Sequence, residues 1–113
     1  MRDDWFYVVH ILDCIANVEE DTAAGREAFL SNRTLRDAVM RNLQILAESS
    51  QRISDSFKEQ FSEVPWRLVG RFRNVAVHDY LDVRWAEIWD IVAIDLPPLK
   101  SQLTRILSNR PHS

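Results

Sequence analysis

The stretch RTLRDAVMRNLQILAESSQRIS, residues 33–54, decides the fold class of this chain. Its apolar residues recur every three or four positions, the spacing that places side chains on one face of an α-helix. Asn42 and Ser49 interrupt that face, so each is expected to hydrogen-bond to a neighbouring helix or to line a contact between two copies of the chain. The expected seam consists of Leu35, Ala38, Val39, Asn42, Ile45, Leu46, Ser49 and Ile53.

The residues that precede this stretch also carry helix signals. A first helix is expected from about Asp4 to Glu19, with an apolar stripe and two aspartates at the positive end of its dipole. A short helix is expected after Gly25. Ser31 or Asn32 should then cap the helix at residues 33–54, because serine and asparagine side chains accept hydrogen bonds from the first turn.

The second half of the chain predicts two or three more helices. Pro65 suits the first turn of a helix that ends close to His78 or Tyr80. A further helix is expected from about Val83. The prolines at positions 97 and 98 should break or kink that helix before the apolar pattern resumes, because proline lacks the backbone N–H.

The composition predicts one all-α domain spanning residues 1–113, a bundle of four to five helices. The chain has only two glycines and four prolines, and its apolar residues follow helical spacing. Its longest apolar run, near residues 91–94, is far shorter than the roughly 20 residues of a membrane-spanning helix. Cys14 is the only cysteine, and no leader segment is evident. We therefore expect a soluble, cytoplasmic protein without membrane partners.

The charge pattern argues against binding of nucleic acid through the overall charge of the chain. Its formal net charge is −3, whereas domains that coat nucleic acid are usually basic overall. Positive charge is instead local: Arg67, Arg71 and Arg73 lie between Pro65 and His78 with no acidic residue among them. Any binding of nucleic acid should therefore be local to this segment.

The same segment holds a group of residues suited to phosphate chemistry. Arg73 keeps its charge and presents a fork of donors that matches phosphate oxygens, and His78 can take and give a proton near neutral pH. Asn74 lies one helical turn before His78, where it can orient the imidazole or bind phosphate. Arg73 and His78 point to different faces of an ideal helix, and an arginine five positions before a histidine occurs often by chance.

The motif resembles that of the HEPN superfamily, and within it the HepT-like toxins of HepT–MntA toxin–antitoxin pairs. That pattern is an arginine, four residues, a histidine, any residue and a tyrosine, which here are Arg73, His78 and Tyr80. One departure lies at residues 46–49, where the family typically has glycine before the glutamate and alanine after it. The resemblance covers nearly the whole chain and includes residues 1–4, 38–43, 64–67, Val83, Trp89 and 95–97.

The resemblance implies an α-helical homodimer whose motif helices face each other and form one composite ribonuclease site. Neither a metal nor a cofactor is expected. The ribose 2′-hydroxyl would attack the phosphodiester, His78 would move protons, and Arg73 would stabilise the phosphorane-like transition state. The products would be a cyclic phosphate and a free 5′-hydroxyl. Positioned proton transfer typically contributes about 10²–10⁴-fold, so losing either residue should nearly abolish cleavage.

The resemblance also implies regulation by a partner. In a type VII system, an MntA-like nucleotidyltransferase antitoxin would transfer AMP to Tyr80. An anionic adduct beside Arg73 would fill the groove and offset the charge that attracts RNA. Alternatively, Tyr80 only packs or hydrogen-bonds at the helix end.

Two other readings of the whole chain stay open. In one, the HEPN-type fold is a binding partner of a nucleotidyltransferase without hydrolytic activity. In the other, it is a structural helical dimer, which gives no reason for three arginines before the histidine.

Several other residues carry weaker functional hypotheses. Arg71 adds a second cation for RNA, and Glu48 either braces Arg73 or is a solvated surface glutamate. His10 and Cys14 are four residues apart on one helix, but two ligands make a poor metal site. The tryptophans are expected to pack in the core or a dimer contact: Trp5, Trp66, Trp85 and Trp89.

Overall fold

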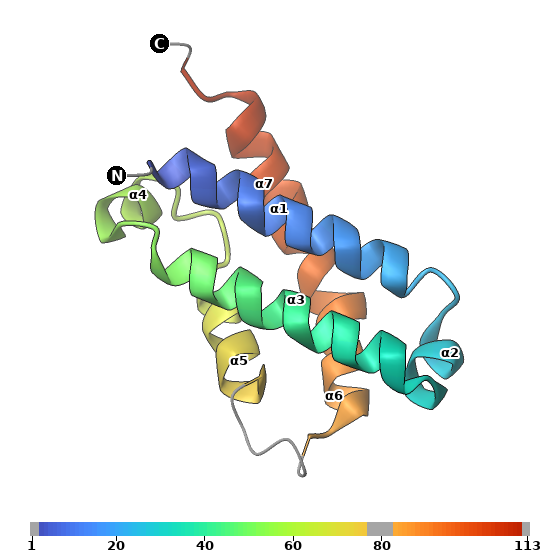
Figure 1. Ribbon diagram of the computed structural model, residues 1–113. Coiled ribbons are helices and arrows are strands. Elements are labelled where there is room, and N and C mark those ends of the chain that lie inside the picture. Colours follow the sequence, from blue (N-terminus) through green and yellow to red (C-terminus); the bar gives the residue numbers. More distant parts are fainter. Residues whose placement is uncertain (1–2, 77–82, 112–113) are drawn as a thin grey trace.

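The computed structural model describes residues 3–76 and 83–111, and side chains in the first range through Arg73. All regular secondary structure in these ranges is helical, which confirms the all-α prediction. Figure 1 shows the helices side by side in a bundle, with the N-terminus and the C-terminus toward the same end. None of the described helices is both long and apolar enough to cross a membrane.

Two long antiparallel helices, α1 (Asp4–Asp21) and α3 (Arg33–Gln51), form one side of the bundle (Figure 1). Both begin with a side-chain cap, of which the sequence predicts the one on α3. Asp3 accepts a hydrogen bond from the N–H of Phe6 at 2.9 Å, and Asn32 accepts one from the N–H of Leu35 at 3.1 Å. Asn32, rather than Ser31, is therefore the cap of α3.

The connection between these helices holds the short helix α2 (Arg26–Ser31). Gly25 precedes it with φ of +97°, a conformation that favours glycine because it has no Cβ. Phe29 of α2 is fully buried and contacts the rings of Trp85 and Trp89 from the second half of the chain. The short helix thus closes one end of the bundle.

The expected helix at residues 33–54 is shorter than predicted. Helix α3 ends at Gln51, and a separate helix, α4 (Asp55–Gln60), follows it. Ser54 accepts a hydrogen bond from the N–H of Phe57 at 3.2 Å and so caps α4 instead of continuing α3. Its N–H and hydroxyl both donate to the carboxylate of Asp4, at 2.9 and 2.8 Å.

The prolines in the second half do not interrupt the helical path. Helix α6 (Trp85–Asp90) leads into a π-helical segment, η2 (Ile91–Asp95), and then into α7 (Leu96–Ser108). The two prolines occupy the first turn of α7, where a missing N–H costs least. The wider turns of η2 directly precede them. A break at the prolines is therefore wrong, because helical residues continue from 85 to 108; the predicted kink stays a prediction.

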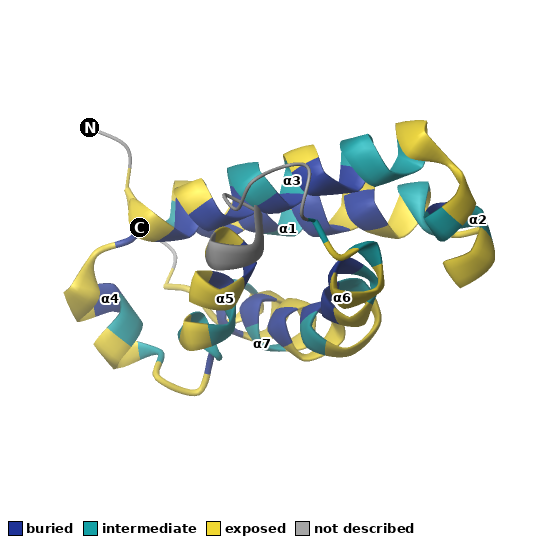
Figure 2. Ribbon diagram, turned by 90° about the horizontal axis from the view of Figure 1, so that it is seen from below, coloured by how far each residue is buried: buried dark blue, intermediate teal, exposed yellow. Residues whose placement is uncertain are grey.

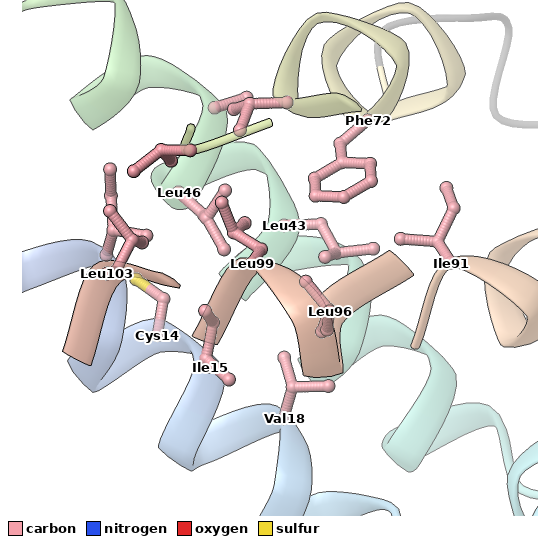
Figure 3. Packing of buried hydrophobic residues seen from close by; sticks show 14 of the residues in the cluster. Cys14, Ile15, Val18, Leu43, Leu46, Phe72, Ile91, Leu96, Leu99 and Leu103 are labelled. Carbon is pink, nitrogen blue, oxygen red and sulfur yellow. The ribbon is translucent and has the colours of Figure 1, made fainter. Parts of the chain in front are cut away.

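The interior is apolar and is shared by all the long helices. Figure 2 shows buried residues on the facing sides of the helices and exposed residues on their outer sides. Phe72 points from α5 (Trp66–Ala76) into this cluster (Figure 3). The largest fully buried side chains are Phe29, Phe72, Ile11, Ile15, Leu43, Leu46, Ile88, Ile91, Leu99, Leu103, Val8 and Val18.

The polar residues of the predicted seam and the four tryptophans pack within the chain. The side-chain amide of Asn17 donates to the side-chain oxygen of Asn42 at 3.1 Å, so Asn42 pairs across α1 and α3. Ser49 is buried within the chain. The four tryptophans pack partly buried against the core, as expected.

Candidate functional site

Helix α5 has an apolar face and a basic face. Val69 and Phe72 are buried in the core, and this fixes the rotation of the helix. Arg67, Gly70, Arg71 and Arg73 are consequently exposed on the remaining surface. Because Arg71 and Arg73 flank Phe72 in sequence, burial of this phenylalanine turns both guanidinium groups toward solvent.

A groove of about 350 Å³ lies between the C-terminal half of α3 and helix α5. We call it the α3–α5 groove. None of the described residues that line it is acidic, although the chain as a whole is negatively charged. The groove can therefore attract an anion locally. Its lining residues are Ala47, Ser50, Gln51, Arg67, Val69, Gly70, Arg71 and Arg73.

Arg71 forms an ion pair with a residue of η2, the helical segment that leads into α7. Its Nη2 lies 3.8 Å from Oδ2 of Asp95 at the end of η2. The Asp95 side chain is 13% exposed, whereas that of Arg71 is 63% exposed. This ion pair neutralises part of the charge of Arg71. Within the described residues, no acidic side chain pairs with Arg67 or Arg73.

The predicted motif is only partly within the described residues. Arg73 is exposed and lines the α3–α5 groove, and Asn74 lies in the last turns of α5. His78 and Tyr80 fall outside the described residues, as does the side chain of Asn74. Glu48 is exposed on α3 and forms no ion pair with a described arginine, which favours a solvated glutamate over a brace for Arg73.

His10 and Cys14, which were considered as metal ligands, belong to no cluster of possible ligands in the described part of the chain. No group of three histidine, cysteine, aspartate or glutamate side chains lies close enough to hold an ion in the part of the chain that is described. His10 is exposed and stacks against Phe6, with ring centroids 6.1 Å apart. Cys14 is buried, and its burial, followed by the nearby charge of Asp13, raises the pKa of the thiol.

Comparison with known proteins assigns the fold to a family. The model of the family described as HepT-like, Ribonuclease HepT-like, matches residues 11–106, from the middle of α1 to near the end of α7. The chain belongs to the HepT-like ribonuclease family. This confirms the resemblance that the motif and the neighbouring residues indicated.

Curated relatives extend the similarity over almost all of the chain. It is 34% identical over 101 residues to "Probable ribonuclease HepT" of Thermococcus cleftensis, covering 88% of this chain and 92% of the relative. It is 33% identical over 103 residues to "Putative RNase MJ1380" of Methanocaldococcus jannaschii, covering 90% and 94%. No solved structure matches the chain significantly.

Another relative in the same archaeon is a longer protein. The chain is 30% identical over 107 residues to "Gamma-glutamylcyclotransferase and putative RNase MJ0434", covering 94% of this chain. It spans only 48% of that relative's length. The HepT-like unit therefore also occurs joined to a second segment.

Sequence patterns did not predict the contribution of α3 to this site. Ser50 and Gln51 line the groove opposite the arginines, but nothing in their local sequence marks them. Gly70 carries a usable signal, because glycine inside a predicted helix usually has a packing or functional reason. Ala47 is buried at the groove, within the stretch where this sequence departs from the typical family pattern.

Proposed function

We propose that this protein is a metal-independent endoribonuclease toxin of a type VII toxin–antitoxin system. Membership of the HepT-like ribonuclease family supports the activity. The observation that carries the proposal for this chain is the exposed position of Arg73 in a groove whose described lining contains no acid. An arginine in such surroundings is available to an RNA phosphate, because no carboxylate in the described part of the chain competes for its donors.

The proposed reaction uses groups that the motif supplies. The ribose 2′-hydroxyl attacks the adjacent phosphorus, and His78 accepts its proton. The 5′-oxygen leaves with a proton from an imidazolium, which yields a 2′,3′-cyclic phosphate and a free 5′-hydroxyl. Arg73 donates hydrogen bonds to the equatorial oxygens, where negative charge grows in the transition state.

We propose that two copies of the chain assemble this site. On an ideal helix, side chains five residues apart differ by about 140° in direction, so Arg73 and His78 do not stack on one another. Motif helices that face each other across a homodimer would bring an arginine and a histidine of different copies together. Size-exclusion chromatography with light scattering should then give twice the mass of the chain.

The catalytic assignment is tested with purified protein and RNA in EDTA. The unsubstituted protein should cleave, whereas His78→Ala and Arg73→Ala should lose at least about 100-fold in rate. Arg33→Ala is the matched control, because Arg33 is an exposed arginine at the opposite end of α3 from the groove. Equal cleavage by all four proteins would exclude this site as the catalyst.

Regulation by AMP transfer to Tyr80 is the second part of the proposal. A phosphate ester on this phenol, two residues after His78, would place negative charge close to the cationic groove. Incubation with ATP and the cognate nucleotidyltransferase should add the mass of one AMP to the chain. Tyr80→Phe should stay unmodified, and an unchanged mass of the original protein would rule out this modification.

Growth on expression separates the toxin from a non-catalytic binding partner. A catalytic toxin should arrest cells, and His78→Ala should restore growth at the same protein level. Unaffected growth with the original sequence, together with stable binding to a nucleotidyltransferase, would support the partner role instead.

A further inference from the structure

We propose that the α3–α5 groove holds an RNA phosphate next to the one that is cleaved, with Arg67 as its main ligand. This inference rests on the proposed ribonuclease function and adds a substrate subsite to it. The subsite would make the enzyme favour longer RNA over a dinucleotide. It also assigns a role to residues outside the motif.

The position of the groove along α5 supports a flanking subsite. Arg73 lines it at one end, and Arg67 lies six residues earlier. At 1.5 Å per residue, their Cα atoms are separated by about 9 Å along the helix axis. In the proposed function Arg73 serves the reacting phosphate, and at this separation Arg67 is placed to meet another phosphate of the same strand.

The chemistry of the lining fits a phosphate diester. Arg67 is exposed, and no acidic side chain among the described residues pairs with it. Arg71 is already directed toward Asp95, so its charge is partly used within the fold. Gln51, which is exposed, adds an uncharged hydrogen-bonding group from α3 on the other wall, beside the buried Ser50. Charged and neutral donors around one concave surface are typical of backbone recognition in nucleic acids.

Gly70 gives an independent indication that something approaches this face of α5. Glycine weakens the interior of a helix relative to alanine. A Cβ added at Gly70 would meet nothing within 4 Å among the described residues, so their packing gives no reason for its absence. A missing side chain at the floor of a basic groove is instead explained by the close approach of an outside molecule. Extended RNA fits the charge of the surrounding residues.

The first test measures affinity for a fluorescent 12-nucleotide RNA in a His78→Ala background, where cleavage does not interfere. Adding Arg67→Ala should weaken binding about tenfold at low salt. The slope of log affinity against log salt should become less negative by about 0.7, the value for one phosphate contact on a single strand. Adding Arg33→Ala instead removes the same charge outside the groove and should leave affinity within about twofold. Unchanged affinity and slope in the Arg67 variant would overturn the proposal.

The second test uses substrate length with otherwise unsubstituted protein. Arg67→Ala should lower kcat/KM about tenfold more on the longer RNA, through a higher KM, than on a dinucleoside monophosphate, which has only the reacting phosphate. Equal losses on both substrates would mean that Arg67 acts at the reacting phosphate, and this would overturn the subsite. Cleavage that survives His78→Ala would sink the proposed catalytic site, and the affinity test would then decide the groove with a 2′-O-methyl RNA of the same length, which lacks the attacking hydroxyl.

The third test fills the groove without changing charge. Gly70→Leu should weaken RNA binding at least as much as Arg67→Ala, while the melting temperature stays equal or rises because leucine favours the helix. If Gly70→Leu instead dissociates a dimer and Arg67→Ala binds RNA normally, the groove is a contact between copies of the chain. That result would reject the RNA subsite.

Discussion

The guanidinium of Arg71 and the carboxylate of Asp95 lie 3.8 Å apart and join helix α5 to the end of the π-helical segment η2. The two residues are 24 positions apart, and the chain between them includes the motif. Their ion pair connects α5, which precedes His78 and Tyr80 in the chain, to η2, which follows them. It therefore holds the basic face of α5 in a defined relation to α7.

This pair should contribute measurable coupling in a double-mutant cycle with Arg71→Gln and Asp95→Asn. We expect about 0.5–1 kcal/mol, near the upper end for surface pairs, because the Asp95 side chain is only 13% exposed. The more exposed pair Arg33–Asp37, at 3.7 Å, is the matched control and should give less than about 0.5 kcal/mol. Urea unfolding of each set of four proteins measures both values. A coupling no larger than that of the control pair would contradict this expectation.

Ser54→Ala should destabilise the fold by about 1–2 kcal/mol. The substitution removes the cap of α4 and the hydroxyl that donates to Asp4, while the backbone bond to Asp4 remains possible. Thermal unfolding followed by circular dichroism measures the change. Ser101→Ala, at an exposed position of α7, serves as control and should be neutral or slightly stabilising. Equal melting temperatures of the two variants would show that the Ser54 contacts contribute little.

Phe72→Ala should lower the free energy of unfolding by about 3–5 kcal/mol, because it leaves a cavity where a fully buried ring packs. Phe72→Leu should cost much less, since leucine fills most of that volume. Substitution of the neighbouring exposed Arg73 by alanine should change stability by less than about 0.5 kcal/mol. Chemical denaturation distinguishes the three proteins. A large loss for Arg73→Ala would mean that Arg73 supports the fold as well as the site.

Gly70→Ala should stabilise the chain by about 0.5–1 kcal/mol, because alanine has the higher helix propensity and its Cβ meets nothing within 4 Å. The same substitution at Gly25 should be destabilising, since its φ of +97° strains any residue with a Cβ. Comparing the melting temperatures of both variants with the original protein tests these opposite signs. A lower melting temperature for Gly70→Ala would indicate a contact at this helix face.

Cys14 should react slowly with iodoacetamide in the native protein and quickly in urea. Burial, followed by the charge of Asp13, raises the pKa of the thiol, so the reactive thiolate is scarce at neutral pH. The native rate should increase only as the pH rises above the ordinary range of a cysteine. Asp13→Asn should speed the reaction only slightly, because burial is the larger cause. Rapid modification of the native protein would contradict a closed core.

Local sequence predicted most helices because capping and apolar spacing act within one or two turns. Asp3 and Asn32 cap the helices that follow them, and the seam at residues 33–54 correctly indicated an amphipathic helix. The errors also have local causes. Ser54 was included in α3 although a serine followed by an aspartate also starts a helix, and the prolines of α7 suggested a break where a first turn accommodates them.

By itself, the sequence determined the all-α class, the positions of most helices and the run of arginines before His78, because these depend on residues close together in the chain. Only the tertiary structure decided that Asp4 binds Ser54, that Arg71 meets Asp95, and that Ser50 and Gln51 face the arginines of α5. Such pairs depend on how apolar faces pack, and burial of Phe72 fixes which side of α5 remains exposed to solvent. The spacing of charges along a chain does not specify that rotation, since every helix can in principle present several faces to its neighbours.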